Sequence, residues 1–427
     1  MDITLSRVNR IEGIIEVPAD KSITHRAVIL SSIAEGMSVV KNYLPSDDCL
    51  RTIEAFRLMG VDIKQDSGSL IIEGRGLSLN KPKRAIYAGN SGTTARLMSG
   101  ILAGQNFESI LTGDESLSKR PMERVIKPLT MMGAGFEAKD FHLPMTIIGA
   151  LNLRGIHYKS AKSSAQVKSA VLFAGLYANG ITSYSEPFKS RDHSEKMLRA
   201  FGADIEVAGN KVSISKAKKL NPQNITVAGD ISSAAFFIAA ALLVPDSCLT
   251  IKNVGINPTR DGFIECVKKM GADITFENVR DICGEPVADI IVRYSPLKAF
   301  NIDSKIVPRM IDEIPIYALL ASRAEGTTKI TGALELRVKE SDRISAIASQ
   351  FKKIGVEIEE LEDGFIICGN SKREIQGGIV DSFSDHRIAM TLAVAALIAK
   401  DALSIKDASC VNISFPNFYE VLKTVCH

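Results

Sequence analysis

The chain has 427 residues, of which 45% are hydrophobic and 24% charged, a composition typical of a folded globular protein and not of a disordered one. The formal net charge is only +3, there is no Trp and no long basic run, so nothing indicates a nucleic-acid-binding face. Seven Cys residues are an odd number and form no CxxC pair, which argues against a disulfide framework or a zinc site.

The N-terminal stretch MDITLSRVNRIEG lacks the basic-then-apolar order of a secretory signal. The longest apolar run, AAFFIAAALLV, is shorter than the ~20 residues that a membrane span needs. We therefore expect a cytoplasmic protein that does not enter a membrane.

A unit of helix, glycine and short strand recurs along the chain. It occurs at RLMGVDIK, TMMGAGFEA, RAFGADIEV, KKMGADITF and KKIGVEIEE, and a sixth copy of the helix is expected at NFYEVLKTVCH. The glycines are Gly60, Gly133, Gly202, Gly271 and Gly355. Since glycine tolerates a positive φ, these positions predict five helix C-termini.

Each unit also contains a second, more apolar helix that leads into a strand. The six segments are 27–40, 95–111, 168–184, 233–251, 314–330 and 387–405. Helices that are apolar on nearly every side are buried, whereas those before the glycines carry charge on one side. The pattern predicts buried helices inside a shell of sheets.

The stretches ahead of these buried helices carry polar capping residues. They are DKSITHR, GNSGTTAR, KSSAQVKS, GDISSAA, RMIDEIP and FSDHR. If six such helices begin on the same side, their positive dipole ends converge on one region that attracts anions.

Pro or Gly at VPADKS and TVAGDISS marks two places where the chain could cross between domains. Three repeats lie between these points and three lie outside them. We therefore expect residues 1–18 plus 229–427 to form domain I, with the N-terminal strand wrapping back, and residues 19–228 to form domain II. A cleft is expected between the two.

Cations cluster near the predicted helix starts, and solvated surface charge is the simpler interpretation of them. They are Lys21, Arg26, Arg96, Lys168, Lys339, Arg343 and Arg387, with Arg120 and Arg124 in the loop LTGDESLSKRPMER. Their position beside capping residues and free amides favours phosphate or carboxylate binding. Gly92 would let a ligand approach the backbone, although NSGTT could equally be a turn. Ser163, Ser164 and Gln166 offer neutral hydrogen bonds.

Four carboxylates are acid–base candidates: Asp312, Glu313, Glu340 and Asp342. Acidic residues at helix starts are usually caps, but cations beside them would tune their proton affinity for transfer. The sequence does not distinguish which of them is catalytic. His25 and His386 each precede an Arg, and we expect structural roles for both, because no HExxH, Walker or Rossmann motif is present.

Together these motifs resemble the 5-enolpyruvylshikimate-3-phosphate synthase (EPSP synthase) family. The matching segments are PADKSITHR, GNSGTTAR, SKRPM, SSAQVKSA, SRDHSEKML, GDISSAAFF, RVKESDRI and SDHRIAM, which run in order through the whole chain. The resemblance implies an α/β fold, a two-domain inside-out α/β barrel of six βαβαββ repeats, three per domain, with the active site in the interdomain cleft. It also implies transfer of the enolpyruvyl group of phosphoenolpyruvate to the 5-hydroxyl of shikimate 3-phosphate, without metal or cofactor. A monomer is expected, although no sequence feature records the oligomeric state.

The family's residue roles map onto matching positions. For shikimate 3-phosphate the resemblance implies Lys21, Ser22, Arg26, Ser163, Ser164, Gln166, Asp312 and Lys339. For phosphoenolpyruvate it implies Lys21, Gly92, Arg120, Gln166, Arg343 and Arg387. Asp312 resembles the base for the hydroxyl proton, Glu340 with Lys339 resembles the group that manages protonation of the methylene carbon, and Lys21 resembles a residue shared by both substrates.

Two positions depart from the pattern of many members. Ile413 stands where those members have Lys, so one cation of the phosphoenolpyruvate site is missing, and Glu335 stands where they have Asn. Both features, with AQVK and RPM, resemble the class II branch, which varies in its tolerance of the herbicide glyphosate. Gly92 is the small residue associated with sensitivity.

Two alternatives remain open at this stage. A UDP-N-acetylglucosamine enolpyruvyl transferase shares the fold and the chemistry, but it usually has a Cys in the loop that corresponds to LTGDESLSKRP, where this chain has none. A non-catalytic anion-binding scaffold is disfavoured by Asp312 and Glu340, because negative charge among the cations would weaken anion binding.

Overall fold

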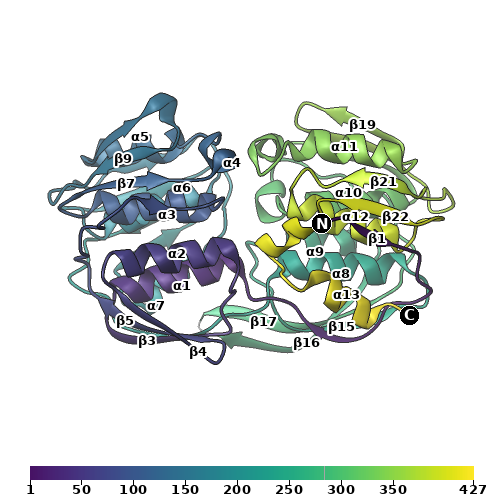
Figure 1. Ribbon diagram of the computed structural model, residues 1–427, viewed down its shortest axis with the longest axis horizontal. Coiled ribbons are helices and arrows are strands. Elements are labelled where there is room, and N and C mark those ends of the chain that lie inside the picture. Colours follow the sequence, from purple (N-terminus) through teal and green to yellow (C-terminus); the bar gives the residue numbers. More distant parts are fainter. Residues whose placement is uncertain (283) are drawn as a thin grey trace. The chain divides into compact units, whose positions relative to one another are not determined.

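The structure is a computed structural model that describes residues 1–282 and 284–427, so the thiol of Cys283 lies outside the described residues. The chain divides into two compact units (Figure 1). Unit 1 comprises Met1–Pro18, Ala228–Arg280 and Pro286–His427, and unit 2 comprises Ala19–Val227 and Asp281–Glu285. In the described part of the chain, no helix is both long and apolar enough to cross a membrane.

Unit 2 contains three four-stranded sheets that share one pairing pattern. In each sheet the first two strands are parallel and the following pairs are antiparallel. The strand orders are β14 (Asn224–Thr226), β3 (Glu35–Lys41), β5 (Ser69–Arg75), β4 (Asp62–Asp66); β6 (Ile86–Tyr87), β7 (Glu108–Thr112), β9 (Met145–Ile148), β8 (Gly135–Ala138); and β10 (His157–Lys159), β11 (Thr182–Ser185), β13 (Lys211–Ile214), β12 (Ile205–Ala208).

Three almost wholly buried helices of unit 2 lie at the centre of its hydrophobic core. They are α1 (Lys21–Ile33), α3 (Gly92–Ala103) and α6 (Ala165–Gly175), and α3 packs against both of the others. The more amphipathic helices are α2 (Asp47–Leu58), α5 (Glu123–Met132) and α7 (His193–Ala200); α4 (Glu115–Ser118) and the 3-10 turn η1 (Lys139–Phe141) are short. The expected buried helix layer is therefore present in this unit.

Unit 1 also combines three sheets with three buried helices, but two of its sheets have three strands instead of four. Its sheets are β16 (Asp273–Ile282), β17 (Glu285–Arg293), β15 (Cys248–Gly255), β2 (Glu12–Glu16); β18 (Gly326–Ile330), β20 (Gly364–Gly369), β19 (Ile358–Leu361); and β1 (Ile3–Leu5), β22 (Leu403–Lys406), β21 (Gly378–Asp381). The buried helices are α8 (Ile231–Leu243), α10 (Ile314–Arg323) and α12 (His386–Ala396). The others are α9 (Gly262–Lys269), α11 (Arg343–Lys353), α13 (Phe418–Val425) and the 3-10 turns η2 (Val307–Arg309), η3 (Leu334–Val338) and η4 (Ala408–Ile413).

Strands from distant parts of the chain complete the first sheet of each unit. Strand β2, near the N-terminus, pairs in parallel with β15, and β14, at residue 224 and beyond, pairs in parallel with β3. Strand β1 pairs with β22 near the C-terminus. Both units thus close by long-range strand pairing.

The five glycines that the repeat singled out all adopt positive φ at or just after a helix end. Their φ values are 86° at Gly60, 111° at Gly133, 86° at Gly202, 99° at Gly271 and 83° at Gly355. Side chains with a Cβ rarely adopt this backbone region, so glycine ends these helices at little cost. The predicted helix C-termini are confirmed.

Candidate active site

The buried helices of unit 2 begin at polar caps, as the sequence predicts. The carboxylate of Asp20 accepts a hydrogen bond from the Ile23 amide at 2.8 Å, and the Ser91 hydroxyl accepts one from the Thr94 amide at 3.1 Å. Capping fixes where each helix begins, and with it the direction of the first side chains. The candidate residues of unit 2 are therefore attached to rigid helix starts.

Lys21, the first residue of α1, extends towards α2. Its Nζ lies 3.0 Å from Oδ2 of Asp48, and both side chains are largely buried. This ion pair fixes the position of the Lys21 side chain at the start of α1.

Arg26, one turn further along α1, links three segments of unit 2. Its Nε donates to Ser194 Oγ at 2.7 Å and one terminal nitrogen donates to Ser169 Oγ at 2.8 Å. Its other terminal nitrogen donates to the Ser22 carbonyl at 2.9 Å, and Arg191 donates to the Ser22 hydroxyl at 3.3 Å. Ser22 is thus held between two guanidinium groups.

The starts of α3 and α6 are joined through Gln166. Its Oε1 accepts from Arg96 at 2.8 Å, and its Nε2 donates to Thr93 Oγ1 at 3.0 Å. Gly92 lies beside this pair, since a Cβ at that position would meet Arg96 Nη1 at 2.9 Å and Arg120 Nη1 at 3.6 Å. The structure therefore brings Gly92, Gln166 and two arginines together, and a larger residue than glycine would press on the arginines.

Arg120 follows α4 and is held by neighbouring polar groups. It donates to the Asn90 carbonyl at 3.4 Å, to the Asn90 side-chain oxygen, and to Ser116 Oγ at 3.1 Å. Arg124, the other arginine of this loop, lies half-buried in the first turn of α5. Arg120 is thus the one of the two that the structure places beside Gly92.

Ser163 and Ser164 lie at the start of α6. The Ser163 hydroxyl donates to the Phe188 carbonyl at 2.6 Å, and the Ser164 hydroxyl accepts weakly from the Val167 amide at 3.4 Å. The Ser164 amide donates to Glu186 Oε2 at 3.2 Å. Both serines therefore shape this helix start.

Lys168 does not behave as the sequence suggested. Its Nζ lies 3.0 Å from Glu186 and 2.7 Å from Glu195, and all three side chains are almost wholly buried. Two carboxylates more than neutralise one ammonium group, so an anion would be repelled here. The expectation that Lys168 belongs with the anion-binding cations is wrong, because its partners come from segments 18 and more residues away.

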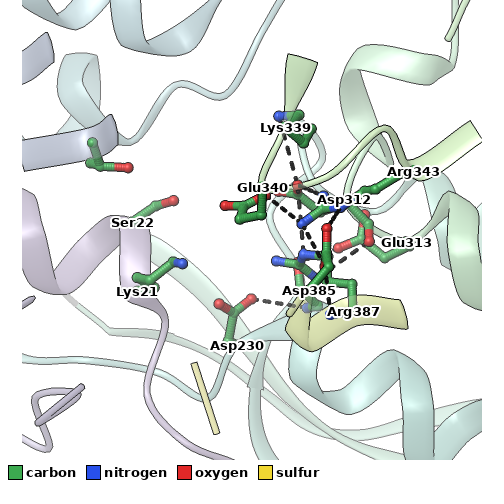
Figure 2. A network of polar contacts seen from close by, with 12 residues as sticks. Lys21, Ser22, Asp230, Asp312, Glu313, Lys339, Glu340, Arg343, Asp385 and Arg387 are labelled. Carbon is green, nitrogen blue, oxygen red and sulfur yellow. Dashed lines mark hydrogen bonds and ion pairs between the residues drawn. The ribbon is translucent and has the colours of Figure 1, made fainter. Parts of the chain in front are cut away.

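In unit 1, Asp312 is surrounded by three cations. Its Oδ1 lies 3.4 Å from Arg343, 3.7 Å from Arg387 and 3.9 Å from Lys339, and Arg387 also donates to its carbonyl at 3.3 Å. Figure 2 shows these side chains pointing toward one another, Asp312 and Lys339 from the segments before α10 and α11, and Arg343 and Arg387 from the first turns of α11 and α12. The structure thus assembles four of the candidate residues within one unit.

Arg343 is the buried centre of this cluster. It pairs with Asp385 at 2.8 Å and with Glu340 at 2.7 Å, in addition to Asp312. Burial alone would lower the pKa of Arg343, but Asp385, Glu340 and Asp312 outweigh it and the pKa lies above its usual value. For Asp385 burial works the other way and would raise the pKa, yet Arg343 lowers it below its usual value. Glu340 is consequently anchored by a permanent cation.

The other two carboxylate candidates have structural partners. Glu313 is fully buried at the start of α10, where its carboxylate accepts from Ser232 and lies 3.9 Å from Arg260. Asp342 caps α11 by accepting from the Ser345 amide at 3.1 Å and pairs with Arg337 at 2.8 Å. Of the four acid–base candidates, Asp312 and Glu340 are therefore the two that contact the candidate cations of unit 1.

Both histidines at helix starts are buried. His25 Nδ1 lies 2.7 Å from Thr52 Oγ1, and burial, with Lys21 and Arg26 nearby, holds the pKa of His25 well below its usual value. His386 is the buried first residue of α12. Within residues 1–282 and 284–427, no group of three or more His, Cys, Asp or Glu side chains is arranged to hold a metal ion.

The two departures from the family pattern lie on 3-10 turns. Ile413 is the half-buried last residue of η4, and Glu335 is half-buried in η3. No cationic side chain can come from position 413.

The sequence did not indicate several residues that hold the candidates in place. These are Asp48 for Lys21, Arg191 for Ser22, Ser194 for Arg26, Asn90 for Arg120 and Asp385 for Arg343. All five lie 27 to 169 residues from their partners, where no local spacing could reveal the contact. Asn90 and Asp385 lie in the capping stretches GNSGTTAR and FSDHR, but those stretches did not indicate which residues they hold.

Comparison with known proteins gives consistent matches over the whole chain. The family profile described as EPSP synthase (3-phosphoshikimate 1-carboxyvinyltransferase) matches residues 5–422. A 3-phosphoshikimate 1-carboxyvinyltransferase of Endomicrobium trichonymphae is 64% identical over 429 residues, covering all of both chains. One from Thermoanaerobacter sp. is 51% identical and covers 98% of this chain and 99% of its own.

The fold has the same relatives. A solved structure of EPSP synthase from Acinetobacter baumannii superposes with a TM-score of 0.89 at 45% identity, covering 100% of this chain and 98% of that one. The expected fold class, a two-domain α/β architecture of the enolpyruvyl transferases, is confirmed by this likeness.

Proposed function

The chain belongs to the EPSP synthase family, and from this premise we propose that it performs the reaction of that family with the residues described above. It is an enolpyruvyl transferase of the shikimate pathway, and so of aromatic amino acid biosynthesis. It transfers the enolpyruvyl group of phosphoenolpyruvate to the 5-hydroxyl of shikimate 3-phosphate and releases phosphate. A UDP-N-acetylglucosamine transferase and an anion-binding scaffold are not favoured, because the matches cover nearly the whole chain.

One observation supports the assignment of chemistry most directly: the Asp312 carboxylate lies among Lys339, Arg343 and Arg387, and Glu340 is anchored on Arg343. A site that only binds anions gains nothing from two carboxylates at this place. A site that must both bind anions and move protons needs them. We assign proton transfer to these two carboxylates.

The residues proposed for shikimate 3-phosphate lie mostly in unit 2. Lys21 and Ser22 begin α1, and their side chains are fixed by Asp48 and Arg191. Arg26 adds buried positive charge close to Ser22. The remaining proposed contacts are Ser163, Ser164 and Gln166 at the start of α6, with Asp312 and Lys339 from unit 1. Helix starts and cations together suit a phosphate group.

Three of the residues proposed for phosphoenolpyruvate are in unit 2: Gln166, which accepts from Arg96, and Gly92 and Arg120, which lie beside each other and next to Arg96. Lys21 is the fourth residue of unit 2 proposed for this substrate, and Arg343 and Arg387 are the residues proposed from unit 1. Glycine at position 92 leaves room next to two arginines, which a carboxylate or phosphate could use.

The mechanism proposed is addition followed by elimination. The 5-hydroxyl oxygen bonds to the second carbon of phosphoenolpyruvate, its proton passes to Asp312, and the methylene carbon gains a proton managed by Glu340 and Lys339. In the second step that carbon loses a proton and the carbon–oxygen bond to phosphate breaks. Fixed arginines and lysines stabilise the charge that develops on the phosphate, and exclusion of water protects the tetrahedral intermediate.

The reaction can be tested by measuring phosphate release from phosphoenolpyruvate with the purified protein. We expect release with shikimate 3-phosphate, and none with UDP-N-acetylglucosamine or without an acceptor. Release with the nucleotide sugar alone would support the first alternative instead. Binding of shikimate 3-phosphate without any turnover would support the scaffold.

Two further parts of the proposal concern the whole protein. We place the enzyme in the cytoplasm, where its phosphorylated substrates are produced and retained, and we propose that it acts as a monomer. Sedimentation of the purified enzyme at assay concentration tests the second point, and a mass of 46.2 kDa is expected.

A further inference from the structure

The short segment Asp281–Glu285 belongs to unit 2, although the residues on both sides of it belong to unit 1. It lies at the junction of β16 and β17, where the Gly284 amide donates to Asp281 Oδ1 at 2.8 Å. Glu285 is the first residue of β17, yet its side chain contacts two residues of α7. The contacts of Glu285 indicate a second purpose.

Glu285 holds the start of α7 with a nearly buried carboxylate. Its Oε1 lies 2.9 Å from His193 Nδ1, and its Oε2 lies 3.5 Å from Lys196 Nζ. We assign the hydrogen of this contact to Nδ1 of His193, because an ionised carboxylate only accepts hydrogen bonds. His193 Nε2 is buried without a hydrogen-bond partner among the described residues, which leaves Nδ1 as the atom that orients the ring.

The residue next to His193 connects this contact to α1. Ser194 Oγ accepts from Arg26 Nε at 2.7 Å and lies 2.6 Å from Ser169 Oγ. Three residues before Ser194, Arg191 donates to the Ser22 hydroxyl at 3.3 Å. The segment that Glu285 holds therefore fixes both Arg26 and Ser22.

We propose that Glu285 and His193 are positioning residues for shikimate 3-phosphate, acting through the start of α7 on Arg26 and Ser22. The inference rests on the proposed function, which assigns Arg26 and Ser22 to that substrate. A hydrogen bond with an ionised partner in a buried setting is stronger than one in water, so its loss frees the ring and the adjacent serine to move. Neither residue is assigned to the chemical step.

The experiment compares Glu285→Ala with Glu277→Gln, a control at an exposed glutamate of β16. Binding of shikimate 3-phosphate is measured by calorimetry, together with both KM values, kcat and the thermal unfolding midpoint. For Glu285→Ala we expect the Kd for shikimate 3-phosphate to rise roughly tenfold, the lower end for losing a hydrogen bond to a charged group. The KM for phosphoenolpyruvate at saturating shikimate 3-phosphate, and kcat, should stay within about twofold, because no phosphoenolpyruvate residue is displaced.

Variants of His193 test whether Glu285 acts on Arg26 and Ser22 through this histidine. His193→Ala should weaken shikimate 3-phosphate binding as Glu285→Ala does, and the double variant should be no worse than either single variant. His193→Asn, whose amide can donate from a position close to Nδ1, should restore most of the affinity. If Glu285→Ala does not fold, Glu285→Met, which nearly keeps the side-chain volume but cannot replace the carboxylate as a strong acceptor, takes its place in the comparison.

Unchanged affinity for shikimate 3-phosphate in the Glu285 variant would overturn the inference. So would additive losses in the double variant, or a parallel change of both KM values with a large fall in the unfolding midpoint, which indicates a general structural role. Failure of the proposed function is recognised separately, because the unmodified enzyme and Glu277→Gln would then not bind shikimate 3-phosphate at all.

Discussion

Each candidate cation at the helix starts is already held by a protein group. Lys21 is held by Asp48, Arg120 by Asn90 and Arg343 by Asp385. A long cationic side chain that is ordered beforehand loses less conformational freedom when an anion binds. The residues that hold the cations therefore matter to affinity although they need not contact the substrate.

Gly92 lies so close to Arg96 and Arg120 that a larger side chain would displace them. In Gly92→Ala, the new Cβ would lie 2.9 Å from Arg96 Nη1, so the guanidinium group that binds Gln166 must shift. We expect the KM for phosphoenolpyruvate to rise roughly tenfold, less than the ~100-fold loss that a 1 Å misplacement of reacting groups can cause. The KM for shikimate 3-phosphate should rise less, because Gln166 is only one of the eight residues proposed for that substrate.

The matched control for this prediction is Gly255→Ala, where a Cβ would make only ordinary contacts at 3.5 Å and 3.7 Å. Steady-state kinetics with each substrate varied in turn gives both KM values. An unchanged KM for phosphoenolpyruvate in Gly92→Ala would mean that this glycine does not face that substrate.

Removing a proposed anion-binding cation should reduce activity much more than it reduces stability. For Lys21→Ala and for Arg120→Ala we expect kcat/KM to fall at least ~100-fold, the size of effect seen when one charge-stabilising donor is lost. Lys64→Ala is the control, because Lys64 is a well-exposed cation paired with Asp62. Circular dichroism and thermal unfolding show whether each variant is folded, and normal turnover by folded Lys21→Ala and Arg120→Ala would contradict the site assignment.

At the scale of elements, local sequence chemistry predicted where helices begin and end. The glycines at helix ends and the polar caps at most helix starts follow from requirements of the backbone within a few residues. Lys168 shows the limit of this approach, since its partners Glu186 and Glu195 come from other segments. Side-chain pairing over long sequence distances depends on tertiary packing, which no local pattern records.

Three helices of unit 2 are joined by a buried polar chain that contains His25. His25 of α1 contacts Thr52 of α2 at 2.7 Å, and Thr52 contacts Thr94 of α3 at 2.8 Å. Burial and the nearby cations Lys21 and Arg26 lower the pKa of His25, so the folded protein keeps this ring neutral. In the unfolded chain the pKa is about 6.5.

This difference predicts a stability that depends on pH. Because the folded pKa is the lower one, the unfolded chain binds the proton more readily, and the contribution of His25 is fully present above about pH 6.5 and is lost as the pH falls. We expect His25 to account for about 1.4 kcal/mol of lost unfolding free energy per pH unit below this value, until its folded pKa is reached.

Urea unfolding at pH 7.5, 6.5 and 5.5 measures this dependence. His25→Asn should make the unfolding free energy depend less on pH. His157→Gln, at an exposed histidine, should leave that pH dependence unchanged. Equal slopes in the unmodified protein and His25→Asn would show that another group is responsible.

At the scale of the whole molecule, neither unit is a single continuous stretch of the chain. Unit 1 is assembled from three pieces of the chain, and its first piece supplies β1 and β2 to two of its sheets. Counting repeats in the sequence led to the expectation of a wrapped N-terminal strand. The assignment of Asp281–Glu285 to unit 2 was not foreseen, because no repeat marks this segment and its contact with His193 spans 92 residues of sequence.

The N-terminal piece should be indispensable to unit 1 and dispensable to unit 2. Ile11, Ile15 and Val17 are buried in the core of unit 1, and β2 pairs with β15. Burial of each such side chain contributes about 1.5–3 kcal/mol, and the total is comparable with the ~5–15 kcal/mol that stabilises a typical domain. We therefore expect a fragment of residues 228–427 not to fold, and a fragment of residues 19–227, which keeps its own core, to unfold cooperatively in urea.

A third chain that joins residues 1–18 directly to residue 228 tests whether the missing strands are the cause. The Asp230 amide donates to the Pro18 carbonyl at 2.9 Å, so the ends to be joined already lie side by side within unit 1. Circular dichroism should show regained structure and a cooperative transition in this chain. Cooperative unfolding of residues 228–427 alone would contradict the prediction, and so would a joined chain that remains unfolded, because in either case β1 and β2 would not be what completes the core.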